Sequence, residues 1–290
     1  MLDGRVAAKK LQERLRERIG ALSQQGITPA IAPILVGEDS AAVVYYRSKT
    51  RLARKLGIRF AGIELPEETD QQELVDTIRR LNIDPQVDGI FVELPLPSHI
   101  SREEIARAIS ADKDIDGINP LSMGLLLVDG AGTTGYRELN ERGGLLLPAT
   151  PRAVMELLLG AGVDLAGKEA VVVGRSLAVG RPLSFLLLTE GATVTICHSK
   201  TRSIKTITRR GDIVCVAIGR PRFLTADMVK KGAVVIDIGI NVTPDGIVGD
   251  VDYEAVAAKA SLITPVPGGV GPMTTTMIMA NVVKCAARRA

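Results

Sequence analysis

Short apolar runs alternate with longer amphipathic stretches along most of the chain. Such runs predict buried strands, and apolar positions three or four residues apart predict helices. We expect helices over about Arg5–Ser23 and Ser40–Leu56, after Thr69, after Ser101, from Pro148 to Leu159, over Pro182–Glu190 and after Thr274. We expect strands at Ala30–Val36, Ile58–Leu65, Gly89–Leu94, Glu169–Val173, Thr193–Cys197, Asp212–Ile218 and Ala233–Ile238. This alternation predicts an α/β fold with a parallel sheet in each half.

Local signals mark helix starts and a break in the middle of the chain. Thr69 with Gln72, and Ser101 with Glu104, have the spacing of a capping box. Between Val128 and Gly144 glycine and polar residues dominate and no period survives. Because 290 residues suffice for two domains, we expect domains over 1–127 and 148–272, with a linker or surface insertion at 128–147.

Composition excludes several classes of protein. With a net charge of +3, 3% aromatic residues and no basic block, a nucleic-acid surface is not expected. No apolar run approaches the length of a membrane span, so no membrane partner is expected. Cys197, Cys215 and Cys285 are far apart and only His99 and His198 are available, so we expect no metal site and no Ser/His/Asp hydrolase. Widely spaced cysteines favour a reducing cytoplasm, and acid–base chemistry falls to lysine, carboxylate or tyrosine.

The segment Val171–Pro182 is typical of a Rossmann phosphate loop. An apolar strand runs into a glycine turn at Gly174, and a helix follows whose N-terminus would favour a pyrophosphate. The usual spacing is absent, because Ser176 stands at the second glycine position and the last glycine is Gly180. Glycine turns before helices also occur for packing alone, but the strand, turn, helix and next strand together favour a dinucleotide site.

The next strand indicates which dinucleotide. It ends Cys197-His198-Ser199-Lys200, without the carboxylate that would accept from the ribose hydroxyls of NAD. Arg175, Ser176 and Ser199 supply positive charge and hydroxyl donors suited to a 2′-phosphate. The sequence therefore predicts NADP in preference to NAD.

Two further stretches are candidates for a substrate site. Pro265–Thr274 contains three prolines and three glycines, so it is neither a helix interior nor a central strand. A linker would explain such composition, but this run is apolar and lies between an apolar strand and an apolar helix. Tyr45 and Lys49 share one face of a predicted helix, where a lysine among several arginines is ordinarily a surface charge.

These stretches resemble the bifunctional methylenetetrahydrofolate dehydrogenase/methenyltetrahydrofolate cyclohydrolase family. The resemblance covers Val36–Lys49, Glu93–Pro97, Lys113–Gly117, the loop at Gly174 and Pro265–Thr274, in the family's order. It implies that an N-terminal folate-binding domain and a C-terminal Rossmann domain form a cleft that binds reduced folate opposite NADP. It also implies that helix 273–290 packs back on the first domain, and that the protein is a homodimer.

The resemblance also assigns roles to individual residues. Lys49 would be catalytic, with Tyr45 and Asp116 holding the folate and Glu93 facing the lysine. The residues that would contact NADP are Gly174, Arg175, Ser176, Ser199 and the backbone of Ile240, and those that would contact the substrate also include Pro267, Gly268, Gly269, Val270 and Gly271. From the residues alone, Ile240 is a core residue at a strand end and Asp116 is an ordinary turn aspartate.

The chain departs from the family at a few positions. Glu93 stands where the family usually has glutamine, Ala149 where it has cysteine and Ser122 where it has asparagine, and Val128–Gly144 is longer. A carboxylate beside Lys49 favours the ammonium form, which is a poor base. We therefore expect dehydrogenase activity to survive and cyclohydrolase activity to be weak or shifted to higher pH.

Three alternatives remain open at this point. A monofunctional dehydrogenase of the same family would keep hydride transfer and lose hydrolysis. A shikimate-type NADP dehydrogenase would share the architecture and use a lysine–aspartate pair, but would have no need of the Pro265–Thr274 loop. A catalytically silent folate- or nucleotide-binding protein would not need both Tyr45 and Lys49.

Overall fold

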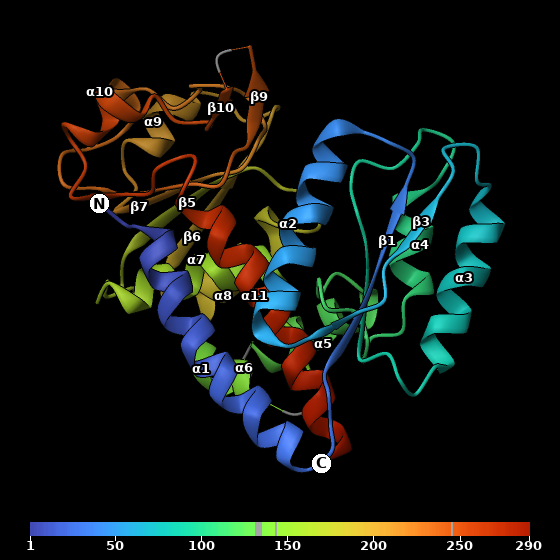
Figure 1. The fold of residues 1–290 in the computed structure, drawn as a ribbon. Coiled ribbons are helices and arrows are strands. Elements are labelled where there is room, and N and C mark those ends of the chain that lie inside the picture. The colour runs from blue at the N-terminus through green and yellow to red at the C-terminus, as the bar shows by residue number, and fades with distance from the viewer. Residues whose placement is uncertain (131–134, 143, 245) are drawn as a thin grey trace. The chain divides into compact units, whose positions relative to one another are not determined.

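The computed structural model describes residues 1–130, 135–142, 144–244 and 246–290, which form two compact units (Figure 1). We name each unit by its sheet. The four-stranded unit comprises Lys10–Gly124, Gly143–Ala149 and Thr275–Ala290, and the five-stranded unit comprises Met1–Lys9, Leu125–Arg142 and Thr150–Thr274. The helices with residues in both units include α1 (Gly4–Gln24), α5 (Pro120–Asp129) and α11 (Val270–Ala286). Because the units interleave along the chain, the contiguous bounds 1–127 and 148–272 stay a prediction.

The four-stranded unit is built around one fully buried strand. Its remaining elements are β1 (Ala30–Val36), α2 (Ser40–Leu56), β2 (Arg59–Phe60), β3 (Ile63–Leu65), α3 (Gln71–Ile83), β4 (Gly89–Val92), α4 (Arg102–Ala108) and η2 (Ala287–Arg289). All seven residues of β1 are buried, and β1 pairs in parallel with β2, β3 and β4. A strand covered on both faces needs an unbroken apolar run, which is why Ala30–Val36 was recognisable in the sequence.

The expected strand Ile58–Leu65 is wrong in one respect, because the structure divides it into β2 and β3. Ile31 pairs with Phe60 and Ile34 pairs with Ile63, so the interruption lies opposite Pro33. Proline has no backbone N–H to donate to a neighbouring strand. The ladder therefore breaks where β1 itself lacks a donor.

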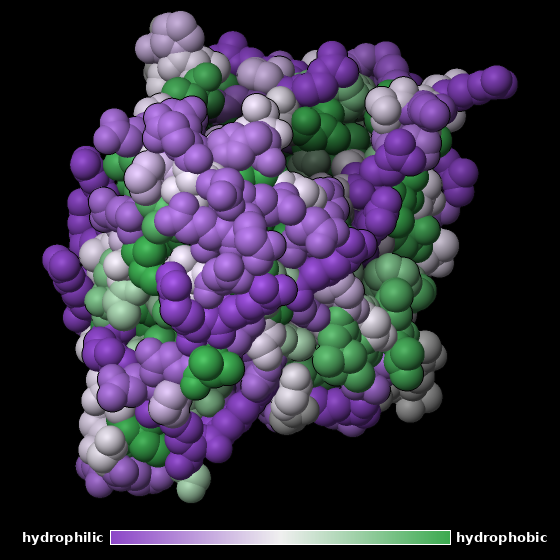
Figure 2. All heavy atoms as spheres, turned by 90° about the vertical axis from the view of Figure 1, so that its right-hand side faces the viewer, coloured by the Kyte–Doolittle hydropathy of each residue, from purple (hydrophilic) through white to green (hydrophobic). Residues whose placement is uncertain are grey.

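Of the two expected capping boxes, one is half formed and one is misplaced: Ser101 caps its helix, but the Ser101 amide donates to the Gln71 side chain at 2.8 Å rather than to Glu104. The Ser101 hydroxyl accepts from the Glu104 amide at 3.3 Å and begins α4, as expected. For α3 the cap is Asp70, not Thr69, because the Asp70 carboxylate accepts from the Glu73 amide at 2.8 Å. Figure 2 looks onto the side that carries α3, where the surface is mainly hydrophilic, as expected for the outer face of an amphipathic helix.

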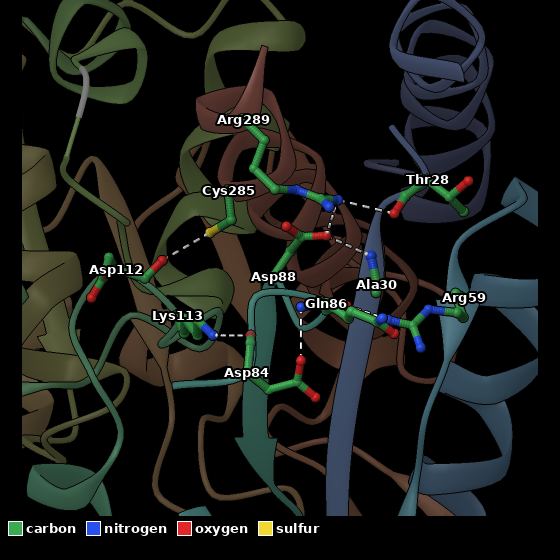
Figure 3. Close-up of polar contacts among 10 residues, drawn as sticks. All are labelled: Thr28, Ala30, Arg59, Asp84, Gln86, Asp88, Asp112, Lys113, Cys285 and Arg289. Atoms are coloured by element: carbon green, nitrogen blue, oxygen red, sulfur yellow. Dashed lines mark hydrogen bonds and ion pairs between the residues drawn. The ribbon is translucent and has the colours of Figure 1, made fainter. Parts of the chain in front are cut away.

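The C-terminal residues are tied to the amino-terminal ends of the strands of the four-stranded unit (Figure 3). Arg289 donates to the buried carboxylate of Asp88 at 2.9 Å and to the Thr28 carbonyl at 3.1 Å. The same Asp88 oxygen accepts the Ala30 amide at 2.8 Å. The pKa of Asp88 is raised by burial, and the bond from Ala30 and the charge of Arg289 oppose that rise. The tail therefore supplies the cation for a carboxylate that the sheet buries.

The five-stranded unit is a doubly wound sheet. Its elements are α6 (Tyr136–Glu141), α7 (Ala149–Gly160), β5 (Glu169–Val173), α8 (Gly180–Thr189), β6 (Thr193–Cys197), α9 (Ile204–Thr208), β7 (Ile213–Val216), η1 (Ala226–Met228), β8 (Val234–Asp237), β9 (Asn241–Thr243), β10 (Gly246–Val248), α10 (Tyr253–Ala257) and β11 (Leu262–Ile263). The strand order is β11-β8-β7-β5-β6, all parallel, with a separate antiparallel hairpin of β9 and β10. The order reverses between β5 and β7, which is where ligands bind in such sheets.

The expected linker or insertion at 128–147 is largely ordered structure in its described part. Tyr136 and Leu139 lie in α6 and are buried, and the Tyr136 hydroxyl donates to Glu156 at 2.8 Å. Leu145, Leu146 and Leu147 are also buried. A helix of six residues shows too little of its period to be recognised among glycines and polar residues. Residues 131–134 and 143 lie outside the described part.

Within the described residues, no helix combines the length and apolar character that a membrane crossing requires.

Candidate active site

Helix α2 presents Tyr45 and Lys49 one turn apart on the same face. The helix begins at Ser40, and the Asp39 carboxylate accepts from the Ala42 amide at 3.0 Å in its first turn. Tyr45 and Lys49 are both partly buried. This degree of burial sets Lys49 apart from the exposed Arg47, Arg51 and Arg54 and argues against a solvated surface charge.

Lys49 is paired with Glu93, and both side chains are largely buried. Glu93 follows the last residue of β4, and its amide donates to the Ile34 carbonyl of β1 at 2.9 Å. Nζ of Lys49 lies 2.6 Å from Oε2 of Glu93, and the two side chains are 12% and 3% exposed. Nζ also lies 4.1 Å from the centre of the Phe91 ring, a geometry in which the ring face attracts the cation. The ammonium is therefore held on two sides.

The second carboxylate oxygen of Glu93 is unusual. Oε1 is buried and, among the described residues, finds no hydrogen-bond partner. Burial raises the pKa of Glu93, Lys49 opposes the rise and Asp116 adds to it. A buried acceptor without a donor is costly. An arrangement of this kind is explained if a ligand supplies the donor.

Asp116 completes the cluster from the loop after α4. Burial raises its pKa, and the charges of Lys49 and Arg102 oppose the rise. The neighbouring Asp114 is fully buried and accepts from the amides of Gly117 at 3.1 Å and Asn119 at 2.5 Å, which fixes the loop. Burial and the charge of Asp116 raise the pKa of Asp114 to about 7.

The structure thus brings together Tyr45, Lys49, Glu93 and Asp116, which the resemblance placed in one site. Burial and the charge of Glu93 both raise the pKa of the Tyr45 hydroxyl. Phe91 was missed, although its place two residues before Glu93 puts both on one face of the strand. Arg102 carried no sequence signal, because only the folded loop puts it near Asp116.

The glycine turn after β5 has the geometry of a phosphate loop. Gly174 has φ +127°, and a Cβ there would lie 2.3 Å from the Ala217 carbonyl oxygen of the loop after β7. Gly180 opens α8, and a Cβ there would lie 2.1 Å from the Gly174 carbonyl oxygen. The turn, the start of α8 and the loop after β7 pack so closely that these two positions require glycine, although the glycine spacing differs from the usual Rossmann pattern. The turn and the N-terminus of α8 fit a pyrophosphate.

The other predicted cofactor residues lie at the same edge of the five-stranded sheet. Arg175 and Ser176 follow β5, Ser199 follows β6, and all three are exposed. The His198 amide donates to the Thr201 hydroxyl at 2.8 Å, which shapes the turn that carries Ser199. Ile240, after β8, is 42% exposed, so it is not the core residue that the sequence alone favoured.

The Pro265–Thr274 loop is as compact as its composition suggests. Gly268 and Gly269 are buried, while Pro267 is exposed. The Gly4 amide donates to the Gly268 carbonyl at 3.0 Å, and a Cβ on Gly4 would lie 1.7 Å from the Gly269 carbonyl oxygen. The backbone of Gly268 and Gly269 is therefore approached closely by the first residue of α1, Gly4. Helix α11 begins at Val270, so Pro272 lies in its first turn, where no N–H is needed.

Comparison with known families decides what these two sites belong to. The family described as "Tetrahydrofolate dehydrogenase/cyclohydrolase, catalytic domain" matches residues 2–116, and "Tetrahydrofolate dehydrogenase/cyclohydrolase, NAD(P)-binding domain" matches residues 148–290. The chain belongs to the tetrahydrofolate dehydrogenase/cyclohydrolase family. The family expected from the motifs is therefore confirmed, as is an α/β fold with one parallel sheet in each half.

Individual relatives of the tetrahydrofolate dehydrogenase/cyclohydrolase family match over nearly the whole chain. The bifunctional protein FolD 2 of Desulfitobacterium hafniense is 46% identical over 284 residues, 98% of this chain and 95% of that protein. The bifunctional methylenetetrahydrofolate dehydrogenase/cyclohydrolase of Campylobacter jejuni is 43% identical, with a TM-score of 0.93 over 100% of this chain and 99% of that chain. The Trypanosoma brucei enzyme, solved with NADP and an inhibitor, is 36% identical, with a TM-score of 0.90 over 99% and 97%.

The likeness to a shikimate-type enzyme is one of fold alone. Shikimate dehydrogenase of Aquifex aeolicus is 13% identical, with a TM-score of 0.50 over 89% of this chain and 96% of that chain. The tetrahydrofolate dehydrogenase/cyclohydrolase family accounts for the specific motifs, whereas the weaker match shows a similar fold and nothing more.

Proposed function

We propose that this chain oxidises methylenetetrahydrofolate to methenyltetrahydrofolate with NADP and hydrolyses methenyltetrahydrofolate to formyltetrahydrofolate. The observation that carries the proposal is the buried pair of Lys49 and Glu93, 2.6 Å apart, in the part of the chain matched by the family's catalytic domain. Bifunctional relatives 46% identical over the full length support both activities.

The folate would be held by groups of the four-stranded unit. Tyr45 offers a ring to stack on and a hydroxyl, and Asp116 offers a carboxylate that accepts N–H groups of the pterin edge. Oε1 of Glu93 is a buried acceptor for which the described residues supply no donor, and a bound substrate can supply one. The backbone of Pro267, Gly268, Gly269, Val270 and Gly271 remains a proposed substrate contact on the grounds of the resemblance alone.

NADP would be held by the turn at Gly174, with Arg175, Ser176 and Ser199 around its 2′-phosphate and the backbone of Ile240 nearby. The exposure of Arg175, Ser176 and Ser199 leaves their polar groups available to a ligand. NADP, when bound, takes up the hydride that leaves the one-carbon bridge. The task of the protein in this first reaction is mainly to orient two bound molecules.

The second reaction needs proton transfer by the protein. Lys49 is the group we assign to it, because it is partly buried and lies within the cluster of Tyr45, Glu93 and Asp116. Water attack on the methenyl carbon releases a proton, and an amine with an available lone pair would accept it. Glu93 opposes this role, because its carboxylate accepts a hydrogen bond from Lys49 Nζ at 2.6 Å and this ion pair must be broken before the amine can accept a proton. We therefore propose that Glu93 lowers cyclohydrolase activity at neutral pH and leaves hydride transfer in place.

A homodimer is the proposed assembly, and the cytoplasm is the proposed location. Strand β6 lies at the edge of the five-stranded sheet, carries no charged residue and exposes Ile196 to 40%. An exposed, uncharged edge strand of this kind is normally covered, and a second copy would cover it. Light scattering on the purified protein measures the assembly, and a monomer at micromolar concentration would remove this part of the proposal.

One assay tests the proposed activities together. The protein is mixed with methylenetetrahydrofolate and NADP, and NADPH formation is followed. Loss of methenyltetrahydrofolate is followed separately without NADP. We expect turnover in both assays. A chain that oxidises shikimate and leaves methylenetetrahydrofolate untouched would overturn the proposal, and turnover in the first assay alone would identify a monofunctional dehydrogenase.

A further inference from the structure

Two buried aspartates lie at the cofactor edge of the five-stranded sheet, outside every motif used so far. Asp237 is the last residue of β8, and Asp250 follows the hairpin of β9 and β10. Their side chains are 3% and 0% exposed. Buried carboxylates need several donors to offset lost hydration, so the donors show what each aspartate holds in place.

The donors of Asp250 come mainly from one turn. Its carboxylate accepts the consecutive amides of Ile218 at 2.7 Å, Gly219 at 2.9 Å and Arg220 at 2.8 Å, which form the turn after β7. The Asn241 side chain donates to the same carboxylate at 2.9 Å. One side chain therefore ties the turn after β7 to the residue that follows Ile240.

Asp237 holds Asp250 in turn. Its carboxylate accepts the amides of Asp250 at 2.9 Å, Val251 at 3.0 Å and Gly239 at 3.0 Å. The two aspartates approach closely because the chain around them lacks side chains. A Cβ on Gly239 would lie 2.1 Å from the Asp250 carboxyl carbon, and a Cβ on Gly249 would lie 1.8 Å from Asp237.

This arrangement acts on the cofactor turn through the loop after β7. Ala217 precedes the three amides that Asp250 holds, and its carbonyl oxygen lies 2.3 Å from where a Cβ of Gly174 would be. The loops after β5 and β7 flank the point where the strand order reverses, which is where a dinucleotide enters such a sheet. Movement of the β7 loop would therefore change the space beside Gly174.

We propose that Asp250 is a positioning residue for the dinucleotide, which it serves by fixing the turn Ile218–Arg220 and, through Asn241, the segment that carries Ile240. The inference rests on the proposed NADP-dependent activity. Asp250 does not touch the reacting atoms. It sets the backbone that lines the cofactor site, and Asp237 fixes the amide of Asp250 itself.

The test replaces Asp250 by asparagine and measures NADP binding directly by titration calorimetry. The amide keeps the shape but loses the charge and gives one oxygen in place of two, so we expect NADP to bind about tenfold more weakly or worse. The KM for NADP should rise by a similar factor. Hydrolysis of methenyltetrahydrofolate, measured without NADP, should stay within about twofold of the parent. That change is much smaller than the loss of NADP affinity expected when one charge-assisted hydrogen bond is removed.

Asp212→Asn is the matched control. Asp212 accepts the Glu169 amide at 2.9 Å at the opposite end of the same sheet and pairs with Lys230. The Asp212→Asn variant should bind NADP with the affinity of the parent protein. If Asp250→Asn does not fold, Asn241→Ala removes one of the four donors and should weaken NADP in the same direction by a smaller factor.

Two outcomes would overturn the inference. Unchanged NADP affinity in a folded Asp250→Asn protein would show that the turn does not depend on the carboxylate. A fall in hydrolysis rate by the same factor as NADP affinity, together with a lower melting temperature, would show that Asp250 has a general structural role. Failure of the proposed function looks different, because the parent protein would then lack oxidation of methylenetetrahydrofolate whatever the variants do.

Discussion

In the four-stranded unit the candidate site consists of charged side chains, whereas in the five-stranded unit it consists mainly of backbone. The charge of Lys49 opposes the rise in the pKa of both Glu93 and Asp116, and one carboxylate oxygen of Glu93 has no donor among the described residues. The turn at Gly174 would accommodate a phosphate because its glycines carry no side chains and because the amides at the start of α8 are close by. Chemistry that moves protons needs groups whose charge can change, and recognition of a phosphate needs only fixed dipoles.

This contrast predicts that the two activities separate on mutation. Changes in the charged cluster should act first on hydrolysis, and changes at the glycine turn should act on NADP-dependent oxidation alone. Two assays on each variant then show whether the division is real.

The largest effect is expected for Lys49→Met, which removes the proposed proton carrier at nearly constant volume. Hydrolysis of methenyltetrahydrofolate should fall by about a hundredfold or more, the usual scale of general acid–base catalysis. Measured NADP affinity should stay near that of the parent. Lys55→Met, on the exposed last turn of the same helix, is the control, and parental hydrolysis by Lys49→Met would mean that the site is misplaced.

Gly174→Ala should come next. The new Cβ would meet the Ala217 carbonyl at 2.3 Å, on a residue whose φ of +127° already disfavours a side chain. Strain of this kind costs about 1–3 kcal/mol, so NADP affinity should fall by roughly tenfold to a hundredfold. Hydrolysis without NADP should persist. Gly160→Ala, in the same unit and with open space around it, should change neither activity; a loss of hydrolysis in Gly174→Ala would contradict the separation.

Arg175→Ala sharpens the choice of cofactor. An exposed guanidinium on a 2′-phosphate contributes a charge-assisted hydrogen bond, so NADP affinity should fall by about tenfold. NAD lacks that phosphate and should lose little, which makes it the internal control. Equal losses for both cofactors in binding titrations would show that Arg175 does not contact the 2′-phosphate.

The smallest expected effect, and the one most particular to this chain, belongs to Glu93→Gln. Glu93 holds Lys49 in an ion pair across 2.6 Å, so removing the carboxylate charge should leave the amine freer to accept a proton. Hydrolysis should rise a few-fold near neutral pH, and its pH profile should move toward acid. The dehydrogenase rate should change little across the same pH range.

A control variant tests whether the effect is specific to Glu93. Asp76→Asn changes an exposed carboxylate on α3 and should leave both pH profiles unaltered. A fall in hydrolysis on Glu93→Gln would show that the carboxylate assists the reaction rather than hindering it.

Much of the fold could be predicted from the sequence where one local cause dominates. Strand Ala30–Val36 and helix Ser40–Leu56 have the predicted bounds because complete burial and amphipathic periodicity each leave a clear pattern. The break between β2 and β3 was missed because its cause, Pro33, lies on another strand. Helix α6 and the hairpin of β9 and β10 were missed because they are too short to show a period.

The candidate sites divide in the same way. Gly174 and the missing carboxylate after β6 are local features, so the sequence itself indicated a dinucleotide and favoured NADP. Lys49 resembled a surface lysine until its motif was recognised. Oε1 of Glu93 has no partner in the described part of the chain, and Asp250 has four donors. Both features depend on residues far apart in sequence, so only the folded chain reveals them.

The open oxygen of Glu93 has a consequence for inhibitor design. A ligand that directs an amide or hydroxyl donor at Oε1 would gain a charge-assisted hydrogen bond to a carboxylate whose side chain is only 3% exposed. A relative with glutamine there offers a neutral amide that can turn either its oxygen or its nitrogen toward the same ligand. Compounds with such a donor should discriminate between enzymes that otherwise share the same pocket chemistry, and the selectivity would rest on a single atom.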